Sequence, residues 1–177
     1  VFLSLNTINL SMKFILLLAA AFPLALQAQD CKLHRDTDPY TRETKLSTGF
    51  IYLTGGSVSI DADSKDIDVL FSIEGADKCY DNNSMAEIMF EGIKSKSTTR
   101  NSGTMNCEGL FHFNFRNSNS SPTTLLQRIC TRKVTQIIFT SNDKKQTKTT
   151  VTLDPQEQEQ LMTLANCLVT EAKSLIK

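Results

Sequence analysis

Apolar and polar residues alternate in a series of short segments between residues 45 and 153. The clearest case is 104–116, where Phe111, Phe113 and Phe115 fall on one face and polar residues fall between them. Successive side chains of a β-strand point to opposite faces, so each such segment predicts a half-buried strand. The predicted strands are 45–54, 57–61, 66–74, 86–92, 104–116, 134–141 and 146–153.

Turn residues separate several of these segments. Gly55-Gly56 lies between two alternating runs and predicts a β-hairpin. Residues 63–66 (Asp-Ser-Lys-Asp) predict a second turn. Residues 32–43 are polar and follow no period, so we expect an N-terminal arm there.

Two segments carry helix signals instead. Ser121-Pro122 offers an N-cap and a first helical residue for a short helix. Asp154-Pro155-Gln156-Glu157 is the strongest helix start, because Glu157 can bond back to the cap amide. An apolar stripe at helical spacing follows it: Leu161, Leu164, Ala165, Leu168, Ala172, Leu175 and Ile176.

Several strands followed by one amphipathic helix predict an α+β fold that is mostly β. We expect an antiparallel sheet or sandwich of about 7–8 strands, closed by the C-terminal helix. No internal repeat or second domain is visible, so 29–177 is interpreted as one secreted domain of 149 residues.

The N-terminal region predicts an exported protein. Met12-Lys13 precedes an apolar run over 14–26, and Leu26 and Ala28 suit cleavage after Ala28. Residues 12–28 therefore form a predicted signal peptide, and 1–11 an upstream, non-native extension. The apolar run is shorter than a membrane-spanning helix needs. A lipoprotein anchored at Cys31 is the alternative, but Gln29-Asp30 differs from the small residues that lipidation sites prefer before the cysteine.

Export gives the five cysteines a context in which pairing is the default. Five cysteines form at most two bridges, in fifteen possible arrangements. We favour Cys79–Cys107 and Cys31–Cys167, which leaves Cys130 free. Their spacing has no CxxC or Cys/His ligand pattern, so we expect neither zinc nor another metal or cofactor.

The near-neutral charge of residues 29–177 limits the classes of partner that we expect. Residues 29–177 carry 18 Lys and Arg against 19 Asp and Glu, a balance that argues against nucleic acid as a partner. The expected partner is an unknown protein or small molecule, and no integral membrane span is predicted after residue 28.

One candidate site follows from strand alternation. His112, Asn114 and Arg116 share one face of the strand in 104–116 and could form a polar strip for an anionic or sugar-like ligand. The alternative is an ordinary solvated strand face. Residues 61–68 place four aspartates at short spacing, as a calcium loop does, but Lys65 and the missing glycine and closing Glu favour a hairpin turn. No catalytic residues are predicted, because no nucleophile motif is present.

Three short motifs carry a resemblance. Cys31 with Asp38-Pro39-Tyr40-Thr41, the run Leu46–Phe50 (LSTGF) and Gln27-Ala28-Gln29 resemble uncharacterised exported β-rich proteins of Bacteroidota-type bacteria. The resemblance implies a compartment and a fold class, and no activity.

The sequence therefore predicts a small exported binding or interaction module of unknown ligand, which is secreted, periplasmic or associated with the outer membrane. A structural, envelope-associated protein is the alternative, and a hydrolase without a recognisable motif is the second alternative.

Overall fold

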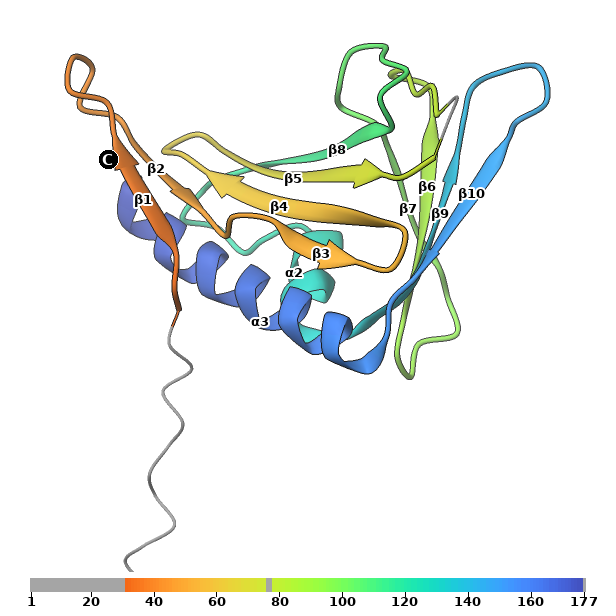
Figure 1. Ribbon diagram of the computed structural model, residues 1–177. Helices are drawn as coiled ribbons and strands as arrows, with labels where there is room; N and C mark the ends of the chain where they lie inside the picture. The colour runs from red at the N-terminus through yellow and green to blue at the C-terminus, as the bar shows by residue number, and fades with distance from the viewer. Residues whose placement is uncertain (1–30, 76–77, 177) are drawn as a thin grey trace, which may run out of the picture. The chain divides into compact units, whose positions relative to one another are not determined.

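The alternating segments form the strands of two antiparallel sheets in a computed structural model, which describes residues 31–75 and 78–176 (Figure 1). The predicted signal peptide and the upstream extension lie outside these residues. The larger sheet has the order β1-β2-β4-β5-β8, with β3 paired to β4. Its strands are β1 (His34–Thr37), β2 (Thr44–Ser47), β3 (Ile51–Leu53), β4 (Gly56–Ala62), β5 (Asp66–Ile73) and β8 (Leu110–Arg116).

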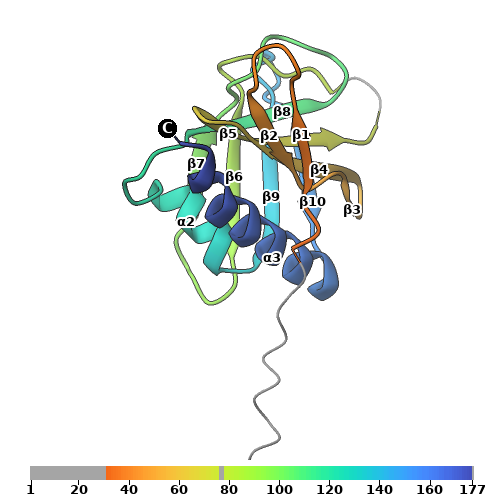
Figure 2. The same cartoon turned by 90° about the vertical axis from the view of Figure 1, so that its left-hand side faces the viewer.

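The smaller sheet has the order β10-β9-β6-β7 and crosses the larger one steeply (Figures 1 and 2). Its strands are β6 (Met85–Phe90), β7 (Ser97–Arg100), β9 (Val134–Thr140) and β10 (Lys148–Thr152). The mostly β, antiparallel fold predicted from the alternation is thus confirmed.

Two helices complete the fold. The short α2 (Thr124–Thr131) packs beside α3 (Pro155–Ala172), which runs along the larger sheet and ends in the 3₁₀ turn η1 (Lys173–Leu175). The buried residues of α3 are Leu161, Ala165, Leu168, Val169 and Ala172. The predicted closure of the sheet by an amphipathic C-terminal helix is confirmed.

The start of α3 follows the predicted capping box. Asp154 Oδ1 accepts hydrogen bonds from the N–H groups of Gln156 and Glu157, and Glu157 Oε2 accepts one from Asp154 N–H at 2.8 Å. Glu157 Oε1 also accepts from the N–H and hydroxyl of Thr54. The same carboxylate therefore caps the helix and ties it to the turn between β3 and β4.

Aromatic rings fill the space where the two sheets meet. Phe139 on β9 is a neighbour of both Phe111 on β8, with ring centroids 5.0 Å apart, and Phe71 on β5. Phe113 on β8 lies beside both Phe71 and Phe111. Tyr80 lies edge-on to Phe111 at 5.3 Å. All five rings are buried, so the alternation of phenylalanines in the sequence identifies the core face of β8 correctly.

The predicted strand 45–54 is interrupted by a β-bulge. Between the pairs Leu46–Ala62 and Ile51–Val58, four residues face three on β4, so the strand divides into β2 and β3. Gly49 supplies the required positive φ of 66°, and the Thr48 hydroxyl accepts the hydrogen bond of Ile60 N–H.

The remaining corrections concern polar edge strands and element ends. The expected N-terminal arm contains β1, whose four residues are all exposed and gain their order from pairing with β2. The polar strand β7 was not predicted either, because its order comes from pairing with β6 and not from an apolar face. The short helix is capped by Thr123, not Ser121, and the strand predicted from 104 begins at Leu110.

The structure contains the disulfides Cys31–Cys167 and Cys79–Cys107, the pairs favoured from the sequence. The first joins the residue preceding β1 by three positions to the flank of α3. The second joins two segments that are also held by the backbone bonds between Tyr80 and Asn106.

Cys130 is a buried free thiol on α2. Burial raises its pKa from 9.0 to about 12, so it stays protonated at neutral pH. Because the thiolate is the reactive form, alkylation by iodoacetamide at pH 8 should be roughly a thousandfold slower in the folded protein than in urea. Quenched-flow labelling with mass detection measures both rates, and equal rates would show an accessible thiol.

Candidate functional site

The outer face of the larger sheet is polar where the inner face is apolar. We define this outer face by the side chains that alternate with the buried core on three neighbouring strands. These are Ser57, Ser59 and Asp61 on β4, Asp66, Asp68, Leu70 and Ser72 on β5, and Leu110, His112, Asn114 and Arg116 on β8.

Strand register brings distant residues of this face together. Asp68 lies opposite Asp61 on one side and Asn114 on the other, while Leu70 lies opposite His112. Directly opposite side chains in antiparallel strands are near neighbours, so these positions form rows across the sheet. Asp61, Asp68 and Asn114 make one such row.

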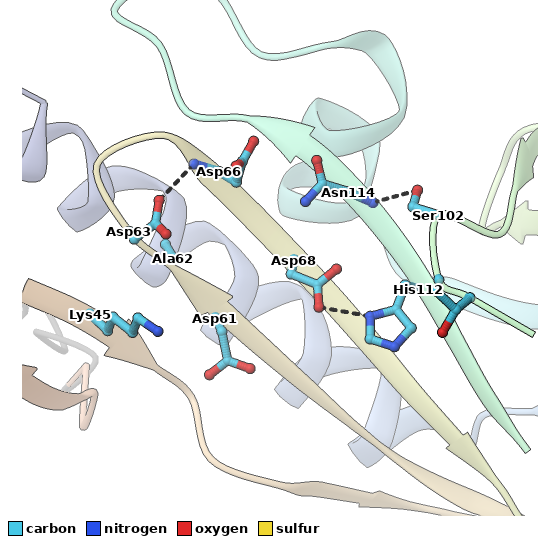
Figure 3. Close-up of a pocket in the computed structure, with 11 residues that line it drawn as sticks. Lys45, Asp61, Ala62, Asp63, Asp66, Asp68, Ser102, His112 and Asn114 are labelled. Atoms are coloured by element: carbon cyan, nitrogen blue, oxygen red, sulfur yellow. Dashed lines mark hydrogen bonds and ion pairs between the residues drawn. The ribbon is translucent and has the colours of Figure 1, made fainter. Parts of the chain in front are cut away.

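A depression of about 780 Å³ lies over this row, between the sheet and the loop 102–104 (Figure 3). Lys45 reaches toward it from β2, beside Asp61. Its other polar walls are Asp66, Asp68, His112 and Asn114. Three segments that are far apart in the sequence, at 45, 61–68 and 102–114, thus contribute to one open, polar site.

The buried residue Asn101 holds the overhanging loop in place. Its Oδ1 accepts hydrogen bonds from His112 N–H at 2.8 Å and Gly103 N–H at 3.1 Å, and its Nδ2 donates to Asp81 C=O at 3.1 Å. Ser102 N–H donates to His112 C=O, so the loop runs along the edge of β8. Gly103 is required because a Cβ there would lie 2.7 Å from the His112 ring.

His112 and Asp68 form a hydrogen-bonded pair in the wall of the depression. Nδ1 of His112 is 3.0 Å from Oδ2 of Asp68, and the two side chains are 29 % and 31 % exposed. Because a carboxylate accepts hydrogen bonds, we assign the proton to Nδ1, which leaves Nε2 as an acceptor in the neutral ring. The pair can orient the imidazole for binding or for proton transfer.

The acidic segment 61–68 forms a turn, as the alternative to a calcium loop predicted. Asp63 Oδ1 accepts the N–H groups of Lys65 and Asp66 at 2.7 and 2.8 Å. Burial opposes ionisation of Asp63, but these two bonds and the charges of Lys45 and Lys65 together lower its pKa. Within 31–75 and 78–176, no three His, Cys, Asp or Glu side chains are placed to hold a metal ion.

The three residues of the predicted strip divide between two depressions. His112 and Asn114 line the one described above. Arg116 lies opposite Asp66 and lines a neighbouring depression of about 720 Å³, together with Asn114 and the loop after β8. Sequence alternation found the shared face of β8, and the segment 61–68 singled out Asp68 only as a possible calcium ligand. Neither signal indicated that Lys45, Asp68 and Asn101 contribute to a site at His112, because those contributions depend on strand register and on a loop.

The negative charges at this site disfavour one of the expected ligand types. Asp61, Asp66 and Asp68 outnumber the ammonium group of Lys45. Among the residues that the structure describes, the Asp61 carboxylate has one hydrogen-bond partner, the Ser59 hydroxyl at 3.2 Å. An anionic ligand would meet repulsion here, whereas hydroxyl and amine donors would find acceptors.

Fold and site together define a disulfide-bonded, mostly β domain with a polar depression on one exposed sheet face. None of the helices in the described residues has the length and hydropathy of a membrane-spanning helix. No protein-family model, curated protein or solved structure matches the chain.

Proposed function

We propose that this protein is an exported binding module that holds a small, polar, uncharged or cationic ligand in the depression over Asp68. The observation that carries the proposal is the convergence of an oriented imidazole, an amide, an ammonium group and carboxylates under one loop. A few convergent polar groups in a concave site are typical of ligand recognition.

The hydrogen-bonding capacity of the site supports this ligand class. Asp66 and Asp68 supply acceptors, while the amide of Asn114 and the ammonium group of Lys45 supply donors. A ligand rich in hydroxyl groups matches such a mixture, because each hydroxyl both donates and accepts.

Export is the second part of the proposal. It is supported by the charged, apolar and small-residue pattern of 12–28 and by two disulfides, which persist in oxidising compartments. The resemblance to exported bacterial proteins remains a prediction.

Native mass spectrometry of the protein purified from its own host tests the binding proposal. We expect a mass that is lost on denaturation and that is absent from Asp68→Asn, which removes the negative charge and replaces one acceptor oxygen with an N–H donor. Glu91→Gln also converts a carboxylate to an amide, but in the exposed turn after β6, which does not line the depression. This control variant should retain the bound mass. A bare wild-type protein would instead favour a structural role in the envelope.

The Asp68–His112 pair also favours a second candidate, a hydrolase that uses His112 Nε2 as a general base. A carboxylate on Nδ1 is the arrangement that orients a catalytic imidazole. However, Ser102 Oγ accepts a hydrogen bond from Asn114 N–H at 3.3 Å, and among the described residues no hydroxyl bonds to Nε2. If His112→Gln kept the bound mass but stopped its conversion to product, this second candidate would replace the first.

A further inference from the structure

The outer face extends beyond the depression to an exposed tyrosine. Tyr52 on β3 lies opposite Ser57 on β4, and Ser72 and Leu110 continue the same row on β5 and β8. Its side chain is 78 % exposed, an unusual state for a large aromatic residue. The neighbouring Phe50 is 64 % exposed.

From this arrangement we infer that the ligand is a chain of neutral sugar rings, with one ring in the depression over Asp68 and another stacked on Tyr52. The inference rests on the proposed function and names the substrate class of the same site.

The spacing of the rows fits a chain and not a single ring. The row of Tyr52 and the row of Asp68 are separated by four positions along β4, the distance from Ser57 to Asp61. At 3.4 Å per residue, this separation is about 14 Å. A single ring cannot span that distance, whereas several linked rings can.

The surface between the two ends suits a sugar chain. The row between the two ends consists of Ser59, Leu70 and His112. Ser59 is buried, so a sugar ring there would contact the half-buried side chains of Leu70 and His112. A pyranose ring has an apolar face of C–H groups and a rim of hydroxyls. An aromatic ring provides a flat apolar platform for the face, and the carboxylates, the imidazole and the amide provide partners for the rim.

Charge decides which sugars fit. Asp61, Asp66 and Asp68 accept hydrogen bonds from hydroxyl groups but repel the carboxylates of acidic sugars. A basic peptide would satisfy the charges equally well, but it would not need the flat ring of Tyr52. The role of Tyr52 therefore separates the sugar chain from a peptide.

The test uses the host-processed protein and a panel of defined probes. The probes are neutral tetrasaccharides of glucose, mannose, galactose and N-acetylglucosamine, the corresponding single sugars, tetragalacturonate and tetralysine. Chemical shifts of backbone amides report where each probe binds, and calorimetry gives its affinity. Tyr40→Ala serves as the matched control for Tyr52→Ala, because Tyr40 is a 93 % exposed tyrosine in the β1–β2 turn and lines no part of the depression.

We expect at least one neutral tetrasaccharide to shift the amides of both rows and to bind more tightly than its single sugar. Tyr52→Ala should weaken the tetrasaccharide about three- to tenfold, as loss of an aromatic contact does, and should leave the single sugar unchanged. Asp68→Asn should weaken both, and Tyr40→Ala neither.

Three outcomes would overturn the proposal that the ligand is a chain of neutral sugars. They are equal affinity for tetragalacturonate, binding of tetralysine with no response to Tyr52→Ala, and no amide shift with any tetrasaccharide. In the last case, a host-derived mass that depends on Asp68 would leave the binding module standing and show that only its ligand class was wrong. Loss of that mass as well would reject both.

Discussion

Replacing Cys31 and Cys167 together with serine is expected to lower the free energy of unfolding by about 5 kcal/mol. The two cysteines are 136 residues apart, so their bond closes nearly the whole described chain into a loop. In the chain-entropy account, a bridge stabilises by restricting the unfolded chain, and the effect grows with the logarithm of loop length. The folded state loses one link, between the chain before β1 and the flank of α3.

Urea unfolding followed by circular dichroism measures this loss. The matched control is the double serine variant of Cys79 and Cys107, whose separation is 28 residues. The same relation gives about 3.6 kcal/mol for that shorter loop. A larger loss for Cys79/Cys107 than for Cys31/Cys167 would contradict the entropic account and would place the main effect in native contacts around Tyr80.

Neighbouring contacts give little compensation for the longer bridge. The ion pair between Arg35 on β1 and Glu171 on α3 is 4.0 Å long, and both side chains are more than half exposed. Exposed pairs of this kind contribute little to stability. We therefore expect β1, an exposed edge strand, to be the first element to separate when the bridge is removed.

The parts of the fold that could be predicted are those that the local pattern determines. Phe111, Phe113 and Phe115 face the core because strand periodicity leaves no other choice once one face is buried. Asp154 begins α3 because its cap bonds depend on residues within one turn. The bulge at Gly49 and the edge strand β1 could not be predicted in this way, because both depend on pairing with a strand distant in sequence.

The candidate site shows the same division more sharply. Alternation placed His112, Asn114 and Arg116 on one face, but the chemistry of that face depends on which strands lie beside β8. Pairing with β5 brings Asp68 to His112, and its negative charge disfavours the anionic ligand that was one of the two expected types. Lys45 enters through β2, two strands away from β5 in the sheet. The register of the four strands β2, β4, β5 and β8 was therefore needed before the site could be described.

Asn101→Ala is expected to be the most damaging single substitution near the site, at about 3–5 kcal/mol of unfolding free energy. The side chain is 3 % exposed, and it bonds the N–H groups of His112 and Gly103 and the C=O of Asp81. Alanine would leave the N–H groups of His112 and Gly103 without their acceptor where water has little access, and each such group costs about 1–3 kcal/mol. Asp81 C=O would lose one of its two donors and keep the N–H of Ser84. The loop 102–104 would also lose one of its attachments to β8 and keep the bond from Ser102 N–H to His112 C=O.

Asn106→Ala is the matched control for this substitution. Asn106 makes comparable bonds to backbone groups of Leu110 and Glu108, but it is half-buried and its partners lie near solvent. Water can replace the lost amide there, so we expect a cost of about 1 kcal/mol.

Urea unfolding measures the loss of unfolding free energy in both variants, and the amide signals of Gly103 and His112 report whether the loop has moved. Equal losses for the two variants would mean that water reaches Asn101 in the folded protein. The loop over the depression would then be held mainly by the bond from Ser102 N–H to His112 C=O.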